Sequence, residues 1–170
     1  MDGSLPDGRA LDVLQTPYGW LKAEPMIETV DRKDTRQRIA ELLVAWDLPA
    51  DDVFDEVVEF SCFCEKGKLL AAIGQERYGE YGLLRSLVVD ETHRNRGLAK
   101  QLVTHLEDVA RESGVRSMYL LTNTAETYFQ SLDYAVVSRE QVPLDIRNTK
   151  QFSTLCPGSA AVMCKELVES

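Results

Sequence analysis

The strongest pattern in this chain is a short apolar run that leads through a polar turn into an amphipathic stretch. The run from Leu87 to Val89 predicts a buried strand. A turn that contains arginines and Gly97 follows it. Apolar side chains then recur at helical spacing and predict a helix with one buried face: Leu98, Leu102, Leu106 and Val109. A strand, a glycine-containing turn and a helix start predict an anion site, because the first helical N–H groups have no partner within the helix.

Patterns upstream of this motif predict three strands and a helix. The segment Met26 to Val30 predicts a strand, and Asp34 or Thr35 is expected to cap the helix that follows. The apolar stripe of that helix consists of Ile39, Leu42, Leu43 and Trp46. The acidic segment 51–56 predicts a short helical turn, and the segments 57–64 and 69–73 predict a β-hairpin.

Patterns downstream of the motif predict alternating strands and helices. Ser113 and Gly114 are a typical helix stop. Strands are expected over 116–121, 134–137 and 160–167, a helix over 125–132, and a short helix or loop over 146–155. This order predicts an α/β (α+β) fold, with a mixed central sheet of about six to seven strands and helices on both faces.

Residues 1–24 contain prolines and glycines without a sustained period, so an irregular N-terminal extension is expected before a domain over 25–170. The first residues are acidic and lack an apolar core, so no secretory signal is expected, and no apolar run is long enough to span a membrane. The cytoplasm is therefore the expected location.

The net charge of the chain limits the classes of partner that are expected. The 170 residues carry a formal net charge of −9, which argues against a nucleic acid or an anionic membrane as partner. Against this background, the local cations Arg94, Arg96 and Lys100 favour a small anionic ligand. The four cysteines show no zinc-type spacing, so no metal is expected and the thiols are interpreted as reduced.

Two motifs resemble a known family. The segment 94–99, Arg-Asn-Arg-Gly-Leu-Ala, resembles the [Gln/Arg]-x-x-Gly-x-[Gly/Ala] signature of the GNAT N-acetyltransferases. The segment 125–134, Ala-Glu-Thr-Tyr-Phe-Gln-Ser-Leu-Asp-Tyr, is similar to the family's Ala-x-x-Phe-Tyr-x-x-Leu-Gly-[Phe/Tyr]. Segments 78–89, 120–122 and 152–163 further resemble the arsenic-resistance branch, whose members are similar to enzymes that acetylate arsinothricin or phosphinothricin.

The resemblance implies acetyl-CoA as cosubstrate. The pyrophosphate would lie on the backbone N–H groups at the helix start, and the pantetheine arm would pair with the strand as an added strand. The thioester carbonyl would lie near Leu87. The implied cofactor-binding residues are Leu87, Val88, Val89, Arg94, Asn95, Arg96, Gly97, Leu98, Ala99, Lys100, Asn123 and Phe129.

The resemblance also implies an acceptor side and a route for protons. Arg85 is expected to hold a substrate carboxylate or phosphinate; the alternative is an ion pair with Glu76, Glu80 or Asp90. Ser86 and Tyr78 are expected to line the same mouth. Glu76 is the expected general base, with a surface carboxylate as the alternative. Because Phe129 stands where the family often has a general-acid tyrosine, the leaving thiolate is expected to take its proton from Tyr134, with water or another group as the alternatives.

The implied activity is transfer of an acetyl group to the primary amine of a small molecule, by direct attack in a ternary complex. The acceptor would be an amino acid or an arsinothricin-like or phosphinothricin-like analogue. The alternatives are a protein or peptide N-acetyltransferase, and a non-catalytic CoA-binding or metalloid-sensing module. Dimers are common in the family, so a homodimer agrees with the resemblance.

Overall fold

A computed structural model describes residues 13–16, 19–22, 26–155 and 158–167, and its central feature is a seven-stranded sheet. The strands in chain order are β3 (Ile27–Val30), β4 (Glu59–Glu65), β5 (Lys68–Tyr78), β6 (Tyr81–Val89), β7 (Ser117–Thr122), β8 (Ala135–Val137) and β9 (Ala161–Glu166). Their spatial order is β3-β4-β5-β6-β7-β9-β8. Only β6 and β7 run parallel, so the sheet is mixed.

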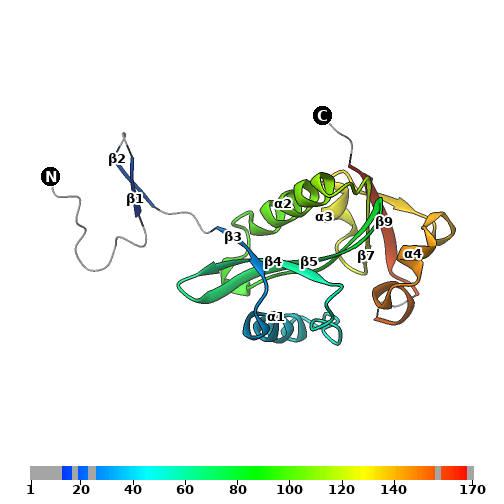
Figure 1. Ribbon diagram of the computed structural model, residues 1–170, viewed down its shortest axis with the longest axis horizontal. Helices are drawn as coiled ribbons and strands as arrows, with labels where there is room; N and C mark the ends of the chain where they lie inside the picture. The colour runs from blue at the N-terminus through cyan, green and yellow to red at the C-terminus, as the bar shows by residue number, and fades with distance from the viewer. Residues whose placement is uncertain (1–12, 17–18, 23–25, 156–157, 168–170) are drawn as a thin grey trace.

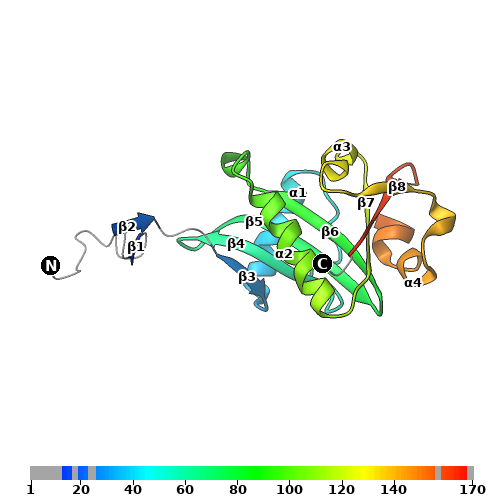
Figure 2. The same cartoon turned by 90° about the horizontal axis from the view of Figure 1, so that it is seen from above.

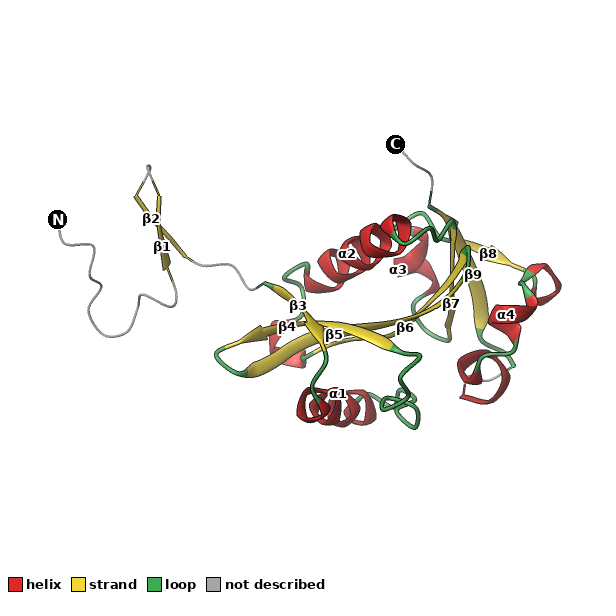
Figure 3. Cartoon of the chain, in the orientation of Figure 1, coloured by secondary structure: helices red, strands yellow, loops and turns green. Residues whose placement is uncertain are grey.

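Helices cover both faces of this sheet (Figure 1; Figure 3). Helix α1 (Lys33–Ala45) packs on one face, and α2 (Leu98–Glu112) packs on the other. Seen from above, α2 lies across β5 and β6 (Figure 2). The short helices α3 (Glu126–Gln130) and α4 (Leu144–Arg147) follow β7 and β8. The predicted α/β fold with a mixed sheet and helices on both faces is confirmed.

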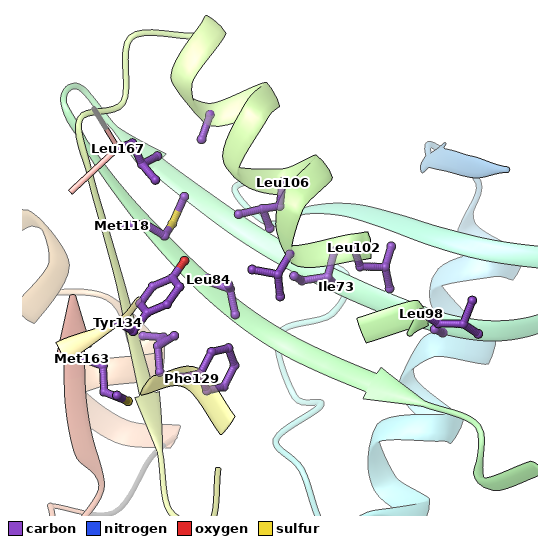
Figure 4. Close-up of a cluster of buried hydrophobic side chains, with 14 of the residues drawn as sticks. Ile73, Leu84, Leu98, Leu102, Leu106, Met118, Phe129, Tyr134, Met163 and Leu167 are labelled. Atoms are coloured by element: carbon purple, nitrogen blue, oxygen red, sulfur yellow. The ribbon is translucent and has the colours of Figure 1, made fainter. Parts of the chain in front are cut away.

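The apolar stripe predicted for the second helix forms the main core. Leu98, Leu102 and Leu106 are buried against side chains of the sheet such as Ile73 and Leu84 (Figure 4). Helix α2 ends at Glu112, and Gly114 follows with φ of 92°, as the predicted stop requires. Burial of this stripe fixes α2, and therefore the turn before it, on the sheet.

Three local predictions are wrong. Helix α1 begins at Lys33 after Arg32, without a side-chain cap, so Asp34 lies in its first turn, where it meets the helix dipole favourably. Residues 51–56 form turns instead of a helical turn, with bonds from the Val53 N–H to the Ala50 carbonyl and from the Asp55 N–H to the Asp52 carbonyl.

The third correction concerns the N-terminal segment, which is not irregular throughout. Strands β1 (Val13–Thr16) and β2 (Gly19–Lys22) pair antiparallel in a two-stranded sheet. The rest of 1–24 lies outside the described residues, and the boundary at residue 25 stays a prediction.

Strand β6 separates from β7 halfway along its length. The two strands pair only from Tyr81, Gly82 and Leu83 to Ser117, Met118 and Tyr119. A Cβ on Gly82 would lie 2.8 Å from the end of the Met118 side chain, so glycine leaves room for that side chain where pairing persists. Beyond Leu83, β6 keeps only its antiparallel neighbour β5.

A β-bulge interrupts β6 in this half. Arg85 pairs with Gly74 and Val88 pairs with Ala72, so Ser86 and Leu87 together face one residue of β5. Ser86 has φ of 55°, in the left-handed region that serine rarely adopts. The strand is therefore bent and strained beside the opening.

Among the described residues, none of the helices has the length and apolar character to cross a membrane.

Candidate functional site

A cavity of about 750 Å³ occupies the opening between β6 and β7. One wall is the bulged part of β6, from Leu84 to Leu87, and the opposite wall runs from Leu120 at the end of β7 into α3. The segment from Trp46 to Pro49, after α1, closes a third side. Arg94, in the turn before α2, also contacts this space. The cavity is thus bounded by elements far apart in the sequence.

The turn before α2 presents backbone N–H groups to solvent. Asn95 and Gly97 have φ of 63° and 76°, and Gly97 immediately precedes the first helical residue. No side chain caps α2, and no acid lies in its first turn. Arg94, Arg96 and Lys100 are exposed around this helix start. The residues predicted as a phosphate cradle therefore lie together beside the cavity.

Two contacts hold this turn in place. The Arg94 guanidinium stacks 3.7 Å from the centre of the Trp46 ring, at the end of α1. The Asp90 carboxylate accepts hydrogen bonds from the Thr92 hydroxyl and the His93 ring, and these bonds lower the pKa of Asp90 to about 2. The turn is therefore tied both to the strand that precedes it and to the segment on the far side of the cavity.

Arg85, at the inner wall, lies in a buried ionic cluster. Its guanidinium forms a bidentate salt bridge with Asp52 and a 3.1 Å hydrogen bond to the Glu76 carboxylate, and its Nε donates to Ser86 Oγ at 3.2 Å. These bonds use four of the five N–H groups of an arginine. Of the three alternative partners predicted for Arg85, Glu76 is present, and the main partner, Asp52, was not predicted.

Glu76 is buried, with both carboxylate oxygens in hydrogen bonds. One oxygen accepts from Arg85 and the other accepts from the Tyr78 hydroxyl at 2.7 Å. The alternative that Glu76 is a surface carboxylate is therefore wrong. Its ion pair with Arg85 offsets the free-energy cost of burying the charge. Burial and the neighbouring Glu76 carboxylate raise the pKa of the Tyr78 hydroxyl. The predicted strand over 69–73 was too short. Strand β5 continues to Tyr78 through polar residues such as Gln75 and Glu76, which interrupt the apolar pattern.

Tyr134 and Tyr128 lie in different surroundings. The Tyr134 hydroxyl is buried in the main core and donates to the Glu107 carboxylate on α2 at 3.0 Å (Figure 4). Burial and Glu107 raise its pKa, and Tyr134 is not among the residues that line the cavity. Tyr128 does line the cavity, and burial raises its pKa. The geometry therefore favours Tyr128 over Tyr134 as the phenol that can meet a ligand.

The other predicted residues on this side lie at the cavity. Ser86, Asn123 and Phe129 contribute to its lining. Thr122 Oγ1 accepts a 2.9 Å hydrogen bond from the Ala125 N–H and so shapes the turn that exposes Asn123. These side chains complete the wall opposite β6.

The described cysteines do not line the cavity. Cys62 and Cys64 have Sγ atoms 3.7 Å apart and are unbridged, and Cys164 is also free. Burial raises the pKa of the Cys62 thiol to about 12. Cys156 lies outside the described residues. Within the ranges that the structure describes, no group of three or more His, Cys, Asp or Glu side chains is placed to hold a metal ion.

Comparison with known families decides the identity of this architecture. The model of the Acetyltransferase (GNAT) family matches residues 19–134, more than half of the chain. The chain belongs to the GNAT acetyltransferase family. An uncharacterized N-acetyltransferase from Chlorobaculum tepidum is 27% identical over 118 residues, which cover 69% of this chain and 72% of that protein. These findings support the family, whereas the arsenic-resistance branch stays a prediction.

Solved GNAT-type structures share the fold at low identity. N-acetylglutamate synthase from Neisseria gonorrhoeae, complexed with coenzyme A and N-acetyl-glutamate, has a TM-score of 0.72 at 17% identity over 96% of this chain. This chain spans only 41% of that longer protein. An aminoglycoside 6'-N-acetyltransferase complexed with coenzyme A has a TM-score of 0.65 at 18% identity, covering 85% of this chain and 98% of that one.

Replacing Tyr134 with phenylalanine tests whether its hydroxyl serves the core. We expect the variant to lose about 1 kcal/mol of unfolding free energy with the hydrogen bond to Glu107, while acetyl transfer stays within about twofold. Urea unfolding and steady-state kinetics measure the two effects. A large loss of turnover at unchanged stability would assign the hydroxyl to catalysis instead.

Proposed function

We propose that this GNAT protein transfers the acetyl group of acetyl-CoA to the primary amine of a small molecule, by direct attack in a ternary complex. The observation that carries the proposal is the cavity at the separation of β6 from β7, which reaches Arg94 beside the uncapped start of α2. One end of this space offers an anion site and the other offers room for an acceptor.

Acetyl-CoA fits the first half of the site. Its pyrophosphate would accept hydrogen bonds from backbone N–H groups of residues 95–100, with Arg96 and Lys100 supplying positive charge. Beyond Leu83, the side of β6 that faces the cavity has no strand partner, so its backbone can pair with the pantetheine amides along residues 87–89. The coenzyme A held by the two structural neighbours supports this assignment.

A small acceptor fits the second half. The cavity volume lies in the range of small-molecule sites, and the two neighbours named above act on or hold small molecules according to their descriptions. We propose an amino acid or an arsinothricin-like or phosphinothricin-like amine. Arg85 and Ser86 line the cavity, and Arg85 has one N–H outside the bonds described above, which would meet an acidic group of the acceptor once its buried guanidinium is uncovered; Tyr78 lies behind them, bonded to Glu76.

The reaction requires two proton transfers. As the amine nitrogen forms its bond to the thioester carbon, its proton would pass to Glu76, which Arg85 holds behind the cavity wall; neither Glu76 nor Tyr78, whose hydroxyl donates to that carboxylate, is among the residues that line the cavity. The carbon–sulfur bond then breaks and the CoA thiolate takes a proton. We propose Tyr128 as that donor, because it lines the cavity and a phenol carries its proton at neutral pH.

A CoA-binding module without catalysis is the second candidate. Phe129 at the family's usual tyrosine position, together with the burial of Tyr134, favours it. A protein or peptide acceptor is the alternative within the same reaction class.

Thermal shift and thiol release distinguish these candidates. We expect CoA and acetyl-CoA to raise the melting temperature, because they bind only the folded protein, and we expect a small amine from a broad panel to accelerate release of free CoA thiol. Binding without release for any amine would favour the non-catalytic module, and release only with peptides would favour a peptide acceptor. A protein whose melting temperature neither CoA nor acetyl-CoA changes would contradict the proposal.

Replacing Gly97 with valine tests the pyrophosphate site. Valine resists the left-handed φ of 76°, so the turn would shift and CoA affinity would fall by about tenfold or more. Gly114→Val is a matched control, because Gly114 has φ of 92° at the other end of α2. Calorimetric titration should give weakened CoA binding in the first variant alone; equal binding in both would overturn the assignment.

Replacing Tyr128 with phenylalanine tests the proton donor. The variant keeps the ring that lines the cavity and loses the hydroxyl, so turnover should fall by about 100-fold while CoA affinity is retained. The Tyr134→Phe variant is its control. Turnover that is unchanged across pH in Tyr128→Phe would exclude the phenol as donor.

A further inference from the structure

We propose that Asp52 is a positioning residue for acetyl transfer: its salt bridge to Arg85 holds the β6 bulge at Ser86 and Leu87 in the shape that orients the thioester. This inference rests on the proposed function, and it concerns a residue that neither sequence motif contains.

The salt bridge joins one wall of the cavity to the turn that follows another wall. Asp52 and Arg85 are each 3% exposed, and their contact is bidentate. Asp52 lies 33 residues before Arg85, in the turn that follows the wall segment from Trp46 to Pro49. Arg36 fixes this turn from α1, with hydrogen bonds of 2.6 Å to the Val53 carbonyl and 2.8 Å to the Val58 carbonyl. Asp52 is therefore a rigid anchor for the arginine.

Arg85 connects Asp52 to the bulge. Ser86 follows Arg85 directly, and its left-handed backbone costs on the order of 1 kcal/mol, so surrounding contacts must maintain it. Arg85 Nε donates to Ser86 Oγ at 3.2 Å while both terminal nitrogens of the guanidinium are held by Asp52. Ser86 and Leu87 both line the cavity, where the thioester is proposed to lie. A small rotation of Arg85 would therefore change the direction of the backbone groups that meet the carbonyl.

The charges of the cluster allow Asp52 to be replaced without leaving an unpaired charge in the core. Arg85 pairs with two carboxylates, so Asp52→Asn leaves the arginine neutralised by Glu76 instead of alone in the core. The asparagine amide keeps the shape of the side chain but turns an NH₂ group toward one arm of the guanidinium, which breaks the bidentate contact. Asp51→Asn is the matched control, because Asp51 is the exposed neighbour in the same turn.

Acetyl-CoA labelled with ¹³C at the acetyl carbonyl provides a readout that needs no acceptor. In the wild-type protein, we expect binding to move the carbonyl resonance from its position in free acetyl-CoA, because backbone N–H groups polarise the bond. In Asp52→Asn, this displacement should shrink by about half or more at saturating ligand, while affinity for acetyl-CoA changes by less than about threefold, since the pyrophosphate cradle is untouched. Asp51→Asn should match the wild type.

A second substitution separates positioning from general stability. Glycine adopts positive φ without penalty, so Ser86→Gly added to Asp52→Asn should restore part of the carbonyl displacement, compared with Ser86→Gly alone. A displacement equal to wild type in Asp52→Asn, or no restoration by Ser86→Gly, would overturn the role of Asp52. Failure of the wild-type protein to bind acetyl-CoA would instead overturn the proposed function.

Discussion

The interaction on which this molecule depends is the pairing between β6 and β7, and above all the point where it stops. Three residue pairs join the strands, the last at Leu83 and Tyr119, and the strands then part. Beyond Leu83, the backbone N–H and carbonyl groups on this side of β6 have no strand partner, so a ligand with amide groups can bond to them. The separation therefore creates both the cavity and the edge that a pantetheine arm can complete.

Two regions of opposite charge character flank this opening. Arg94, Arg96 and Lys100 are exposed around the start of α2, where a polyanion can reach them. On the inner side, one arginine lies between the carboxylates of Asp52 and Glu76, all of them buried. In a chain of formal charge −9, accessible cations thus lie at one end of the opening, and a buried arginine shared by two carboxylates lies at the other. The exposed cations suit binding of an anion, and the buried ion pairs suit precise placement of the β6 backbone.

Three aromatic residues near α3 show how neighbouring sequence positions reach different environments. Phe129 packs against Tyr134 with ring centres 5.6 Å apart, and both belong to the main core. Tyr128 is 37% exposed and meets the cavity. Phe129 also contributes to the cavity lining, but its ring carries no hydroxyl, so Tyr128 is the residue of α3 that brings a phenol to the cavity.

The sequence alone predicted most of the elements and an anion site before α2. Periodicity predicted the mixed sheet and the buried stripe of α2, and Gly97 between a strand and a helix predicted the anion site, because these depend on local spacing and backbone preference. Only the tertiary structure showed the surroundings of Arg85, Glu76 and Tyr134. The salt bridge from Asp52 to Arg85, the burial of Glu76 and the core position of Tyr134 depend on contacts between residues far apart in the chain. An acid or a tyrosine carries no local signal of its partner, and its chemistry follows from that partner.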